Sequence, residues 1–345
     1  MEMKVYTIEQ ADKWDSVVRT FKDYDVYWLS GYVKAFQIHG DGDPLLFYYE
    51  DKATRGINVV FKRDVANDIH FKGKIQENEY FDFATPYGYG GWIIEGDNKD
   101  SLFNAYEKWC VDNGIISEFV RFHPVIQNQV FAENNYEIIP LGLTIAMDLH
   151  SPEVIWENII SKNRNMIRKA EKSGIKIFSG RSEQLYKEFI GIYNSTMDHD
   201  NAEEYYYFKP AFYESICNDL PENAQIFYAV KDEEIIAASI IMSANGRMNY
   251  HLSGSKFEYR NLAPSNLLLY KIALWGCANG CRTFYLGGGV GSGEDNLYKF
   301  KKSFYRRDDL FRFYIGKKIY LQDKYNKLVQ LRGIIERNYF PQYRA

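Results

Sequence analysis

Apolar and polar positions along the chain follow the periods of strands and helices. Alternating or continuous apolar runs predict strands at 44–50, 56–63, 79–91, 116–122 and 282–288, and two or three antiparallel strands between 225 and 254. Helical spacing predicts helices over 101–114, 151–174 and 265–280. Ser151 and Pro152 form a helix start signal, and Gly114 and Gly174 are stop signals. This pattern predicts an α/β protein with mixed sheets.

A short motif repeats at the ends of two predicted helices. Residues 109–114 read WCVDNG and residues 275–280 read WGCANG, and a strand-like run follows each. The order of strand, loop, helix, glycine and strand is the same around both copies, so we interpret them as a duplicated α/β unit. We expect one domain at 1–148 and a second at 149–310. The last segment, 311–345, is expected to be a basic helical tail that packs back on the first domain.

The composition is that of a large folded protein. The chain has 345 residues and 46% hydrophobic content, which suits two domains. No apolar run approaches the ~18 residues of a membrane-spanning helix, and the charged N-terminus lacks the apolar core of a signal peptide. We therefore expect a cytoplasmic protein with at most peripheral membrane contact. The four cysteines form no C-x-x-C motif, so we expect reduced thiols and no metal site.

The net charge of −4 hides an asymmetry along the chain. Between Lys299 and Ala345 there are 13 lysines and arginines but only 4 aspartates and glutamates. A basic end of this kind fits an anionic partner such as a phosphate group, RNA or a membrane surface. A solvated basic helix explains the same charges equally well.

Residues 284–304 read FYLGGGVGSGEDNLYKFKKSF and pose the question of a nucleotide loop. The run has no GK[ST], so it is not a Walker A loop, and its glycines lack the spacing of a dinucleotide-binding turn. The chain also has no G-x-S-x-G, no HExxH and no catalytic Cys/His signature. These absences favour chemistry that needs neither a metal nor a covalent intermediate.

Several segments, in order, resemble the Fem-type peptidyl transferases, which belong to the GNAT-like acyltransferases. In the second half the similar segments are SKNRNMIRKAEKSGIKI, YHLSG, LAPSNLLLYKIALWGCANG and YLGGGVGSGEDNLYKFKKSF. In the first half they are TPYGYGG and SEFVRFHP. The resemblance covers roughly residues 14–325 and implies two tandem GNAT-like domains. No heptad run is present, so the coiled-coil arm of some members is not expected, and the chain looks more like the FemX type.

The resemblance implies acyl transfer to an amine in cell-envelope biosynthesis. Fem enzymes take an amino acid from aminoacyl-tRNA and add it to the stem peptide of a UDP-linked or lipid-linked peptidoglycan precursor. Other relatives acylate amino sugars or other small amines from acyl-CoA, which is the alternative here. A non-catalytic protein that binds RNA or precursor is the second alternative. We expect no tightly bound cofactor, tRNA as a possible partner and no DNA. Residues 198–201 read DHDN where relatives carry basic residues, which argues against a UDP-linked acceptor.

The resemblance also points to catalytic residues. Transfer to an amine passes through a tetrahedral oxyanion, which needs a donor aimed at that oxygen and a group that takes the proton of the amine. Phe300 and Lys301 match the Phe-Lys pair of the family, and the Lys301 ammonium is the candidate for the oxyanion. Asp198 is the candidate proton acceptor. A surface lysine is the ordinary alternative for Lys301.

Basic residues form two candidate binding sites. Arg164 and Arg168 are helical neighbours, and together with Lys169 they suit a diphosphate or an RNA backbone, although a charged outer helix face is equally plausible. Arg260 keeps the basic position of the loop that cradles a pyrophosphate in CoA-using GNAT enzymes. In that loop alanine and serine replace two glycines and proline removes one N–H donor, so the CoA site is degraded.

Tyrosines provide candidates for lining a cleft. Tyr87 and Tyr89 lie in the glycine-rich turn TPYGYGG, where the glycines permit a tight turn. Tyr250 lies in the strand-like segment MNYHLSG. Core packing is the ordinary role of such residues.

Overall fold

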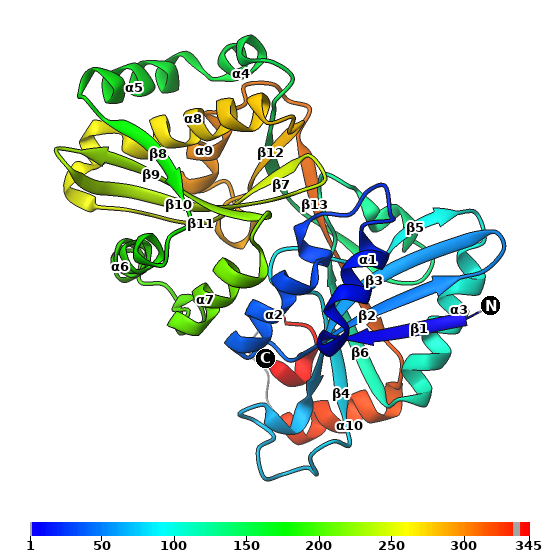
Figure 1. The fold of residues 1–345 in the computed structure, drawn as a ribbon. Coiled ribbons are helices and arrows are strands. Elements are labelled where there is room, and N and C mark those ends of the chain that lie inside the picture. The colour runs from blue at the N-terminus through cyan, green and yellow to red at the C-terminus, as the bar shows by residue number, and fades with distance from the viewer. Residues whose placement is uncertain (1, 334–338) are drawn as a thin grey trace. The chain divides into compact units, whose positions relative to one another are not determined.

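The computed structural model describes residues 2–333 and 339–345, and it divides into two compact units (Figure 1). Unit 1 comprises Met1–Leu141 and Phe313–Ala345, and unit 2 comprises Gly142–Arg312. The chain leaves unit 1 within strand β7 (Glu137–Asp148) and returns to it within strand β13 (Phe311–Ile319). Unit 1 is therefore built from two chain segments that are far apart in the sequence.

Unit 1 is a twisted sheet with helices packed on it (Figure 1). Its strand order is β1-β2-β3-β4-β6-β13, and β5 pairs with β3. Only β4 and β6 run parallel. Helix α3 packs against β3 and β6, and α2 packs against β2. The strand bounds are β1 Glu2–Thr7, β2 Asp43–Glu50, β3 Thr54–Asp64, β4 Phe81–Ala84, β5 Ile93–Gly96 and β6 Ile115–Arg121. The helices are α1 Ala11–Val18, α2 Ser30–His39, α3 Lys99–Asp112 and α10 Gln322–Arg332.

Unit 2 has the strand order β7-β12-β11-β10-β9-β8. Helices α5 and α8 lie on one face of this sheet, and α6 and α7 lie on the other (Figure 1). Only β11 and β12 run parallel within this order. The strands are β8 Lys176–Gly180, β9 Ala224–Lys231, β10 Glu234–Ala244, β11 Arg247–Ser255 and β12 Thr283–Gly287. The helices are α4 Pro152–Asn158, α5 Ser161–Lys172, α6 Glu183–His199, α7 Pro210–Asp219, α8 Pro264–Ala278 and α9 Asn296–Lys302.

The repeated Trp-Asn-Gly motif has the same conformation in both units. The Asn113 side chain donates to the Trp109 carbonyl at 2.8 Å, and Asn279 donates to the Trp275 carbonyl at 2.8 Å. The next residue is in each case a glycine with positive φ, 70° and 75°. Each motif ends a helix that lies in the chain between two strands paired in parallel, and the element order is β4-β5-α3-β6 in unit 1 and β11-α8-β12 in unit 2. The motif therefore ends a helix and leads into a strand in both units, and the duplication of the whole α/β unit stays a prediction.

Two sequence predictions about elements need correction. The helix predicted over 151–174 is split, because Ile159 and Ile160 have extended backbone with ψ of 130° and 151°. Within the tail predicted as helical, residues Phe311–Ile319 form β13, which pairs antiparallel with β6. In the segment 320–338 the structure has α10, and residues 334–338 lie outside the described residues. Helices α6 and α7 were not predicted.

Candidate active site

The sheet of unit 2 opens within β11, beyond its short pairing with β12. The two strands pair only from Arg247–Asn249 to Thr283–Tyr285, and beyond that point they have no ladder pairs with each other. Gly287 ends β12 with a φ of 81°, a left-handed conformation that favours glycine. The backbone at the end of β12 is therefore not paired with β11 and is accessible to another polar group.

Lys301 supplies that group. It lies on α9, its side chain is buried, and its Nζ donates to the Gly288 carbonyl at 2.7 Å. A Cβ on Gly287 would lie 3.4 Å from Nζ, so the turn passes close to the ammonium. Among the described residues the other two N–H groups of the ammonium have no hydrogen-bond acceptor. They remain available to an oxygen of a substrate.

The electrostatic environment of Lys301 is unusual for a lysine. Burial lowers the pKa of Lys301 to about 8, and the charge of Asp295 only partly opposes this effect. The side chain is therefore mostly an ammonium at pH 7, while its proton is held much less tightly than that of an exposed lysine. A cation in a desolvated position interacts strongly with developing negative charge.

The glycine-rich run before α9 is a compact turn. The Asp295 carboxylate caps α9 by accepting from the Tyr298 N–H at 2.8 Å, and it also accepts from the Val290 N–H at 3.2 Å. A Cβ on Gly289 would lie 2.2 Å from the Gly293 carbonyl oxygen, so this close approach requires glycine. Sequence reasoning did not single out Asp295, although an aspartate just before a helical segment is a known N-cap signal.

The segment before α8 is a short 3-10 helix held by side chains of the predicted binding set. Lys169 Nζ donates to the Asn261 carbonyl at 2.6 Å, and the exposed Arg260 guanidinium lies 3.7 Å from the centre of the Phe257 ring. Ala263 has a φ of 58°, a conformation more often taken by glycine, and Pro264 is the first residue of α8. Lys169 therefore supports the loop, and the prediction that it binds substrate remains untested.

Arg164 and Arg168 lie on α5 and share an aromatic partner. Their guanidinium carbons are 5.9 Å and 5.0 Å from the centre of the Trp156 ring on α4. The ring of Tyr270 on α8 lies 5.0 Å from that of Trp156. The predicted pair of arginines is thus brought together at the surface, with ring faces beside the two cations.

Three other predicted residues of unit 2 have contacts that do not involve the Lys301 ammonium. Asp198 is exposed at the end of α6, where it accepts from the Tyr207 hydroxyl at 2.8 Å, and it makes no hydrogen bond or ion pair with Lys301. Phe300 packs edge-on against Phe304, and Tyr250 packs edge-on against Phe284 in the core. Burial raises the pKa of Tyr250.

His251 is a residue that sequence analysis did not select. It lies on β11, two positions beyond the last residue paired with β12, where the strands have separated. Burial lowers the pKa of His251 to about 3, so its ring is neutral at pH 7. Sequence alone provides no signal that this histidine falls at the opening of the sheet.

Tyr87 and Tyr89 belong to unit 1, in the loop between β4 and β5. Tyr87 stacks on Phe36 at 5.3 Å, and Tyr89 packs edge-on against the His123 ring at 5.5 Å. Side chains bind several carbonyls of this loop, including Arg121 to Gly88 at 2.9 Å. Hydrogen bonds from several side chains therefore hold the loop, and both tyrosines are half-buried in it.

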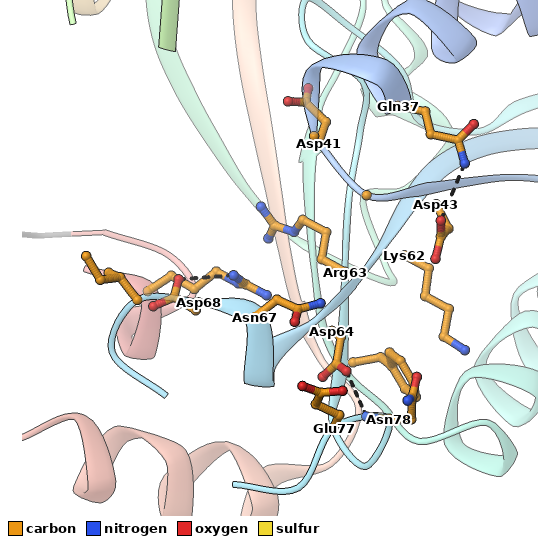
Figure 2. A pocket seen from close by; sticks show the side chains of 15 residues that line it. Gln37, Asp41, Asp43, Lys62, Arg63, Asp64, Asn67, Asp68, Glu77 and Asn78 are labelled. Atoms are coloured by element: carbon orange, nitrogen blue, oxygen red, sulfur yellow. Dashed lines mark hydrogen bonds and ion pairs between the residues drawn. The ribbon is translucent and has the colours of Figure 1, made fainter. Parts of the chain in front are cut away.

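Unit 1 also contains a polar hollow of about 620 Å³ (Figure 2). It is lined by the turn 40–43, the ends of β3 and β4, the segments 67–69 and 77–78, and Arg344. Arg63 points into it, and its Nε donates to buried Asp82 at 2.8 Å. None of the residues predicted as catalytic or binding lines this hollow.

Comparison with known proteins agrees with this fold. Residues 160–302 match the family model of the acetyltransferase (GNAT) domain. The crystal structure of FemX is similar with a TM-score of 0.69 and 13% identity, over 95% of this chain and 99% of FemX. A conserved protein of unknown function from Bacteroides thetaiotaomicron is similar with a TM-score of 0.60 and 10% identity, over 92% of this chain and 99% of that protein. L-PGS from Bacillus licheniformis is similar with a TM-score of 0.51 and 13% identity, over 95% of this chain and 97% of L-PGS. No curated protein sequence matches the chain at a significant level.

The domain match and the opened β11–β12 pair define the class: the chain is an acyltransferase with a GNAT domain. Its fold is similar to that of FemX over nearly the whole chain. The predicted resemblance, fold class and enzyme class are therefore confirmed. None of the helices in the described part of the chain is long and apolar enough to cross a membrane.

Proposed function

We propose that the chain transfers an aminoacyl group from aminoacyl-tRNA to the stem peptide of a peptidoglycan precursor in the cytoplasm. The observation that carries the proposal is the buried Lys301 ammonium beside the open end of β12, inside the acetyltransferase (GNAT) domain. The fold likeness to FemX supports the choice of acceptor, and it is support at the level of fold only.

The reaction that Lys301 serves begins with attack of the acceptor amine on the ester carbonyl of the donor. The new C–N bond forms, the carbonyl oxygen becomes an oxyanion, and the C–O bond to the tRNA then breaks. The leaving hydroxyl gains a proton as the amine loses one. The two N–H groups of Lys301 that have no acceptor are the proposed donors to the oxyanion. Asp198 is the proposed first acceptor of the amine proton.

The donor site is proposed to lie along the basic surface of α5 and the start of α8. Arg164, Arg168 and Lys169 supply the positive charge, and Arg260 adds to it from the turn before α8. A proline at the first position of α8 removes one N–H from the helix end that would receive a CoA pyrophosphate. This loss is the reason for ranking aminoacyl-tRNA first.

The second candidate is an acyl-CoA-dependent N-acyltransferase that acts on an amino sugar or another small amine. The match of residues 160–302 to an acetyltransferase family favours it. The same Lys301 ammonium would serve, with a thioester C–S bond breaking in place of the ester bond.

A ligand comparison followed by one substitution tests the proposal. Thermal shift is measured with acetyl-CoA, charged tRNA, and UDP-linked or lipid-linked precursor, and transfer is then assayed with the ligands that bind. We expect charged tRNA and a precursor to stabilise the protein, and Lys301→Met to lower kcat by about a hundredfold or more. Lys299→Met, in the same helix but exposed, is the matched control and should retain full activity. A shift with acetyl-CoA alone would select the second candidate, and normal turnover by folded Lys301→Met would remove the proposed role.

A further inference from the structure

The helix that carries Lys301 is too short to hold its own position. Helix α9 has seven residues, and helices of this length are marginal without external contacts. Its N-terminus is fixed by the Asp295 cap described above. Its C-cap is Ser303, two residues beyond Lys301. Whatever fixes Ser303 therefore also fixes the depth at which the ammonium meets Gly288.

Ser303 is fixed by a buried asparagine of α5. Asn163 is only 2% exposed, and its Nδ2 donates to the Ser303 Oγ at 2.8 Å. The Ser303 hydroxyl in turn donates to the Phe300 carbonyl at 2.6 Å, and this carbonyl also accepts from the Ser303 backbone N–H at 3.2 Å. The Ser303 carbonyl accepts from the Ile160 N–H at 3.0 Å, which is available because the chain is extended between α4 and α5.

The same asparagine reaches the first turn of α8. The Asn163 Oδ1 accepts from the Asn266 Nδ2 at 2.8 Å. One buried amide thus uses its donor toward α9 and its acceptor toward α8, and hydrogen bonds of this kind are costly to leave unmade. All members of this network belong to unit 2.

We propose that Asn163 is a positioning residue, which holds Lys301 against the end of β12 through Ser303 and ties α9 to the start of α8. It touches no reacting atom. The inference rests on the proposed function only where it concerns turnover, since the placement of Lys301 can be measured without any substrate. A displacement of about 1 Å in a catalytic group can reduce a rate about a hundredfold.

The test measures placement and turnover separately. The protein is pulsed with acetic anhydride, and the acetylation rate of Lys301 is compared by mass spectrometry with that of exposed Lys299 in the same molecule. We expect Asn163→Ala and Ser303→Ala each to raise this ratio several-fold, because Lys301 loses its enclosed position. Asn165→Ala is the matched control, since Asn165 is an exposed residue of the same helix. Its ratio should equal that of the unmodified protein.

Turnover provides the second measurement. We expect the two network variants to lower kcat about tenfold or more while KM changes less than about twofold. Unchanged acetylation of Lys301 in folded Asn163→Ala and Ser303→Ala overturns the proposal, whatever the activity of Lys301→Met. If acetylation changes while Lys301→Met turns over normally, the positioning of Lys301 stands and its role in catalysis fails. Ser303→Ala removes only one hydroxyl, so it keeps the test valid if Asn163→Ala does not fold.

Discussion

Lys301 carries a charge that can be removed within the working range of pH. Burial lowers its pKa to about 8, so the ammonium is present below that pH and is lost as pH rises through it. If the ammonium stabilises the oxyanion, kcat should fall about tenfold for each pH unit above 8. If the neutral amine instead acts as a base, kcat should rise through the same pH. A profile of kcat between pH 6 and pH 10 therefore distinguishes the two roles.

Lys301→Arg is the control for that profile. Arginine keeps its charge throughout this range, so the fall above about pH 8 should disappear even if the overall rate is lower. A fall that persists unchanged in Lys301→Arg would assign the titration to another group. If the fall in kcat above about pH 8 is absent in Lys301→Arg, the charge of this side chain is what the reaction requires.

The sequence identified the lysine but not its surroundings. Lys301 could be selected because Phe300 and Lys301 match the Phe-Lys pair of the family that the sequence resembles, and its role stays a prediction. Its partners could not, because Gly288 and Asn163 are separated from α9 by a turn and by most of unit 2. Hydrogen bonds between distant segments depend on how the chain folds and leave no local pattern. For the same reason Asp198 could be proposed from its type but not placed.

At the level of elements, the two copies of the Trp-Asn-Gly motif should have equal energetic roles. Gly114 and Gly280 both have φ near 70°, where a Cβ is strained, and neither has a close neighbour that would clash with one. Gly114→Ala and Gly280→Ala should therefore each lower the free energy of unfolding by about 1 kcal/mol. Urea unfolding followed by circular dichroism measures both.

Gly191 supplies the control of opposite sign. It lies in the interior of α6 with ordinary helical φ, and a Cβ there would meet nothing within 4 Å. Gly191→Ala should raise the free energy of unfolding by about 0.5–1 kcal/mol, because alanine loses less conformational entropy in a helix. If all three substitutions changed the free energy of unfolding in the same direction, the backbone conformation of the glycines would not be the cause of these changes.

Local patterns predicted the elements whose signals are complete. Strands β2, β3, β4, β6 and β9 to β12 and helices α3 and α8 have regular apolar spacing and were found, whereas β1, β5, β7 and β8 were not predicted. The prediction of one continuous helix over 151–174 was wrong, because the sequence of the Ile159-Ile160 pair does not indicate a break. The break depends instead on the burial of Ile159 and on the hydrogen bond from the Ile160 N–H to the Ser303 carbonyl. The strand β13 was missed because its partner β6 precedes it by nearly two hundred residues.

At the scale of the whole molecule, unit 1 depends on residues from both ends of the chain. Fully buried Asp82 on β4 accepts from Arg63 Nε at 2.8 Å, from Arg344 Nε at 2.6 Å and from the Tyr343 hydroxyl at 3.0 Å. Arg344 also pairs with Asp68 at the polar hollow of Figure 2. Burial alone would raise the pKa of Asp82, but the charges of Arg63 and Arg344 outweigh it and lower the pKa. This carboxylate therefore ties the returning C-terminal segment to the first sheet.

Removing that charge should destabilise unit 1 strongly. Asp82→Asn leaves two guanidinium groups without their counter-charge, one of them largely buried, and should lower the free energy of unfolding by about 3–5 kcal/mol. Asp112→Asn, which removes one partner of an exposed ion pair with Lys108, should change it by less than about 1 kcal/mol. Hydrogen exchange of β4 and β6 locates the effect.

Because the pKa of Asp82 is lowered in the folded state, the stabilisation it provides is present above the ordinary aspartate pKa and is lost as pH falls through the folded value. A comparison of unfolding at pH 7 and at pH 3 should therefore show a smaller decrease in Asp82→Asn than in the unmodified protein, and an equal decrease would mean that other carboxylates govern the acid sensitivity.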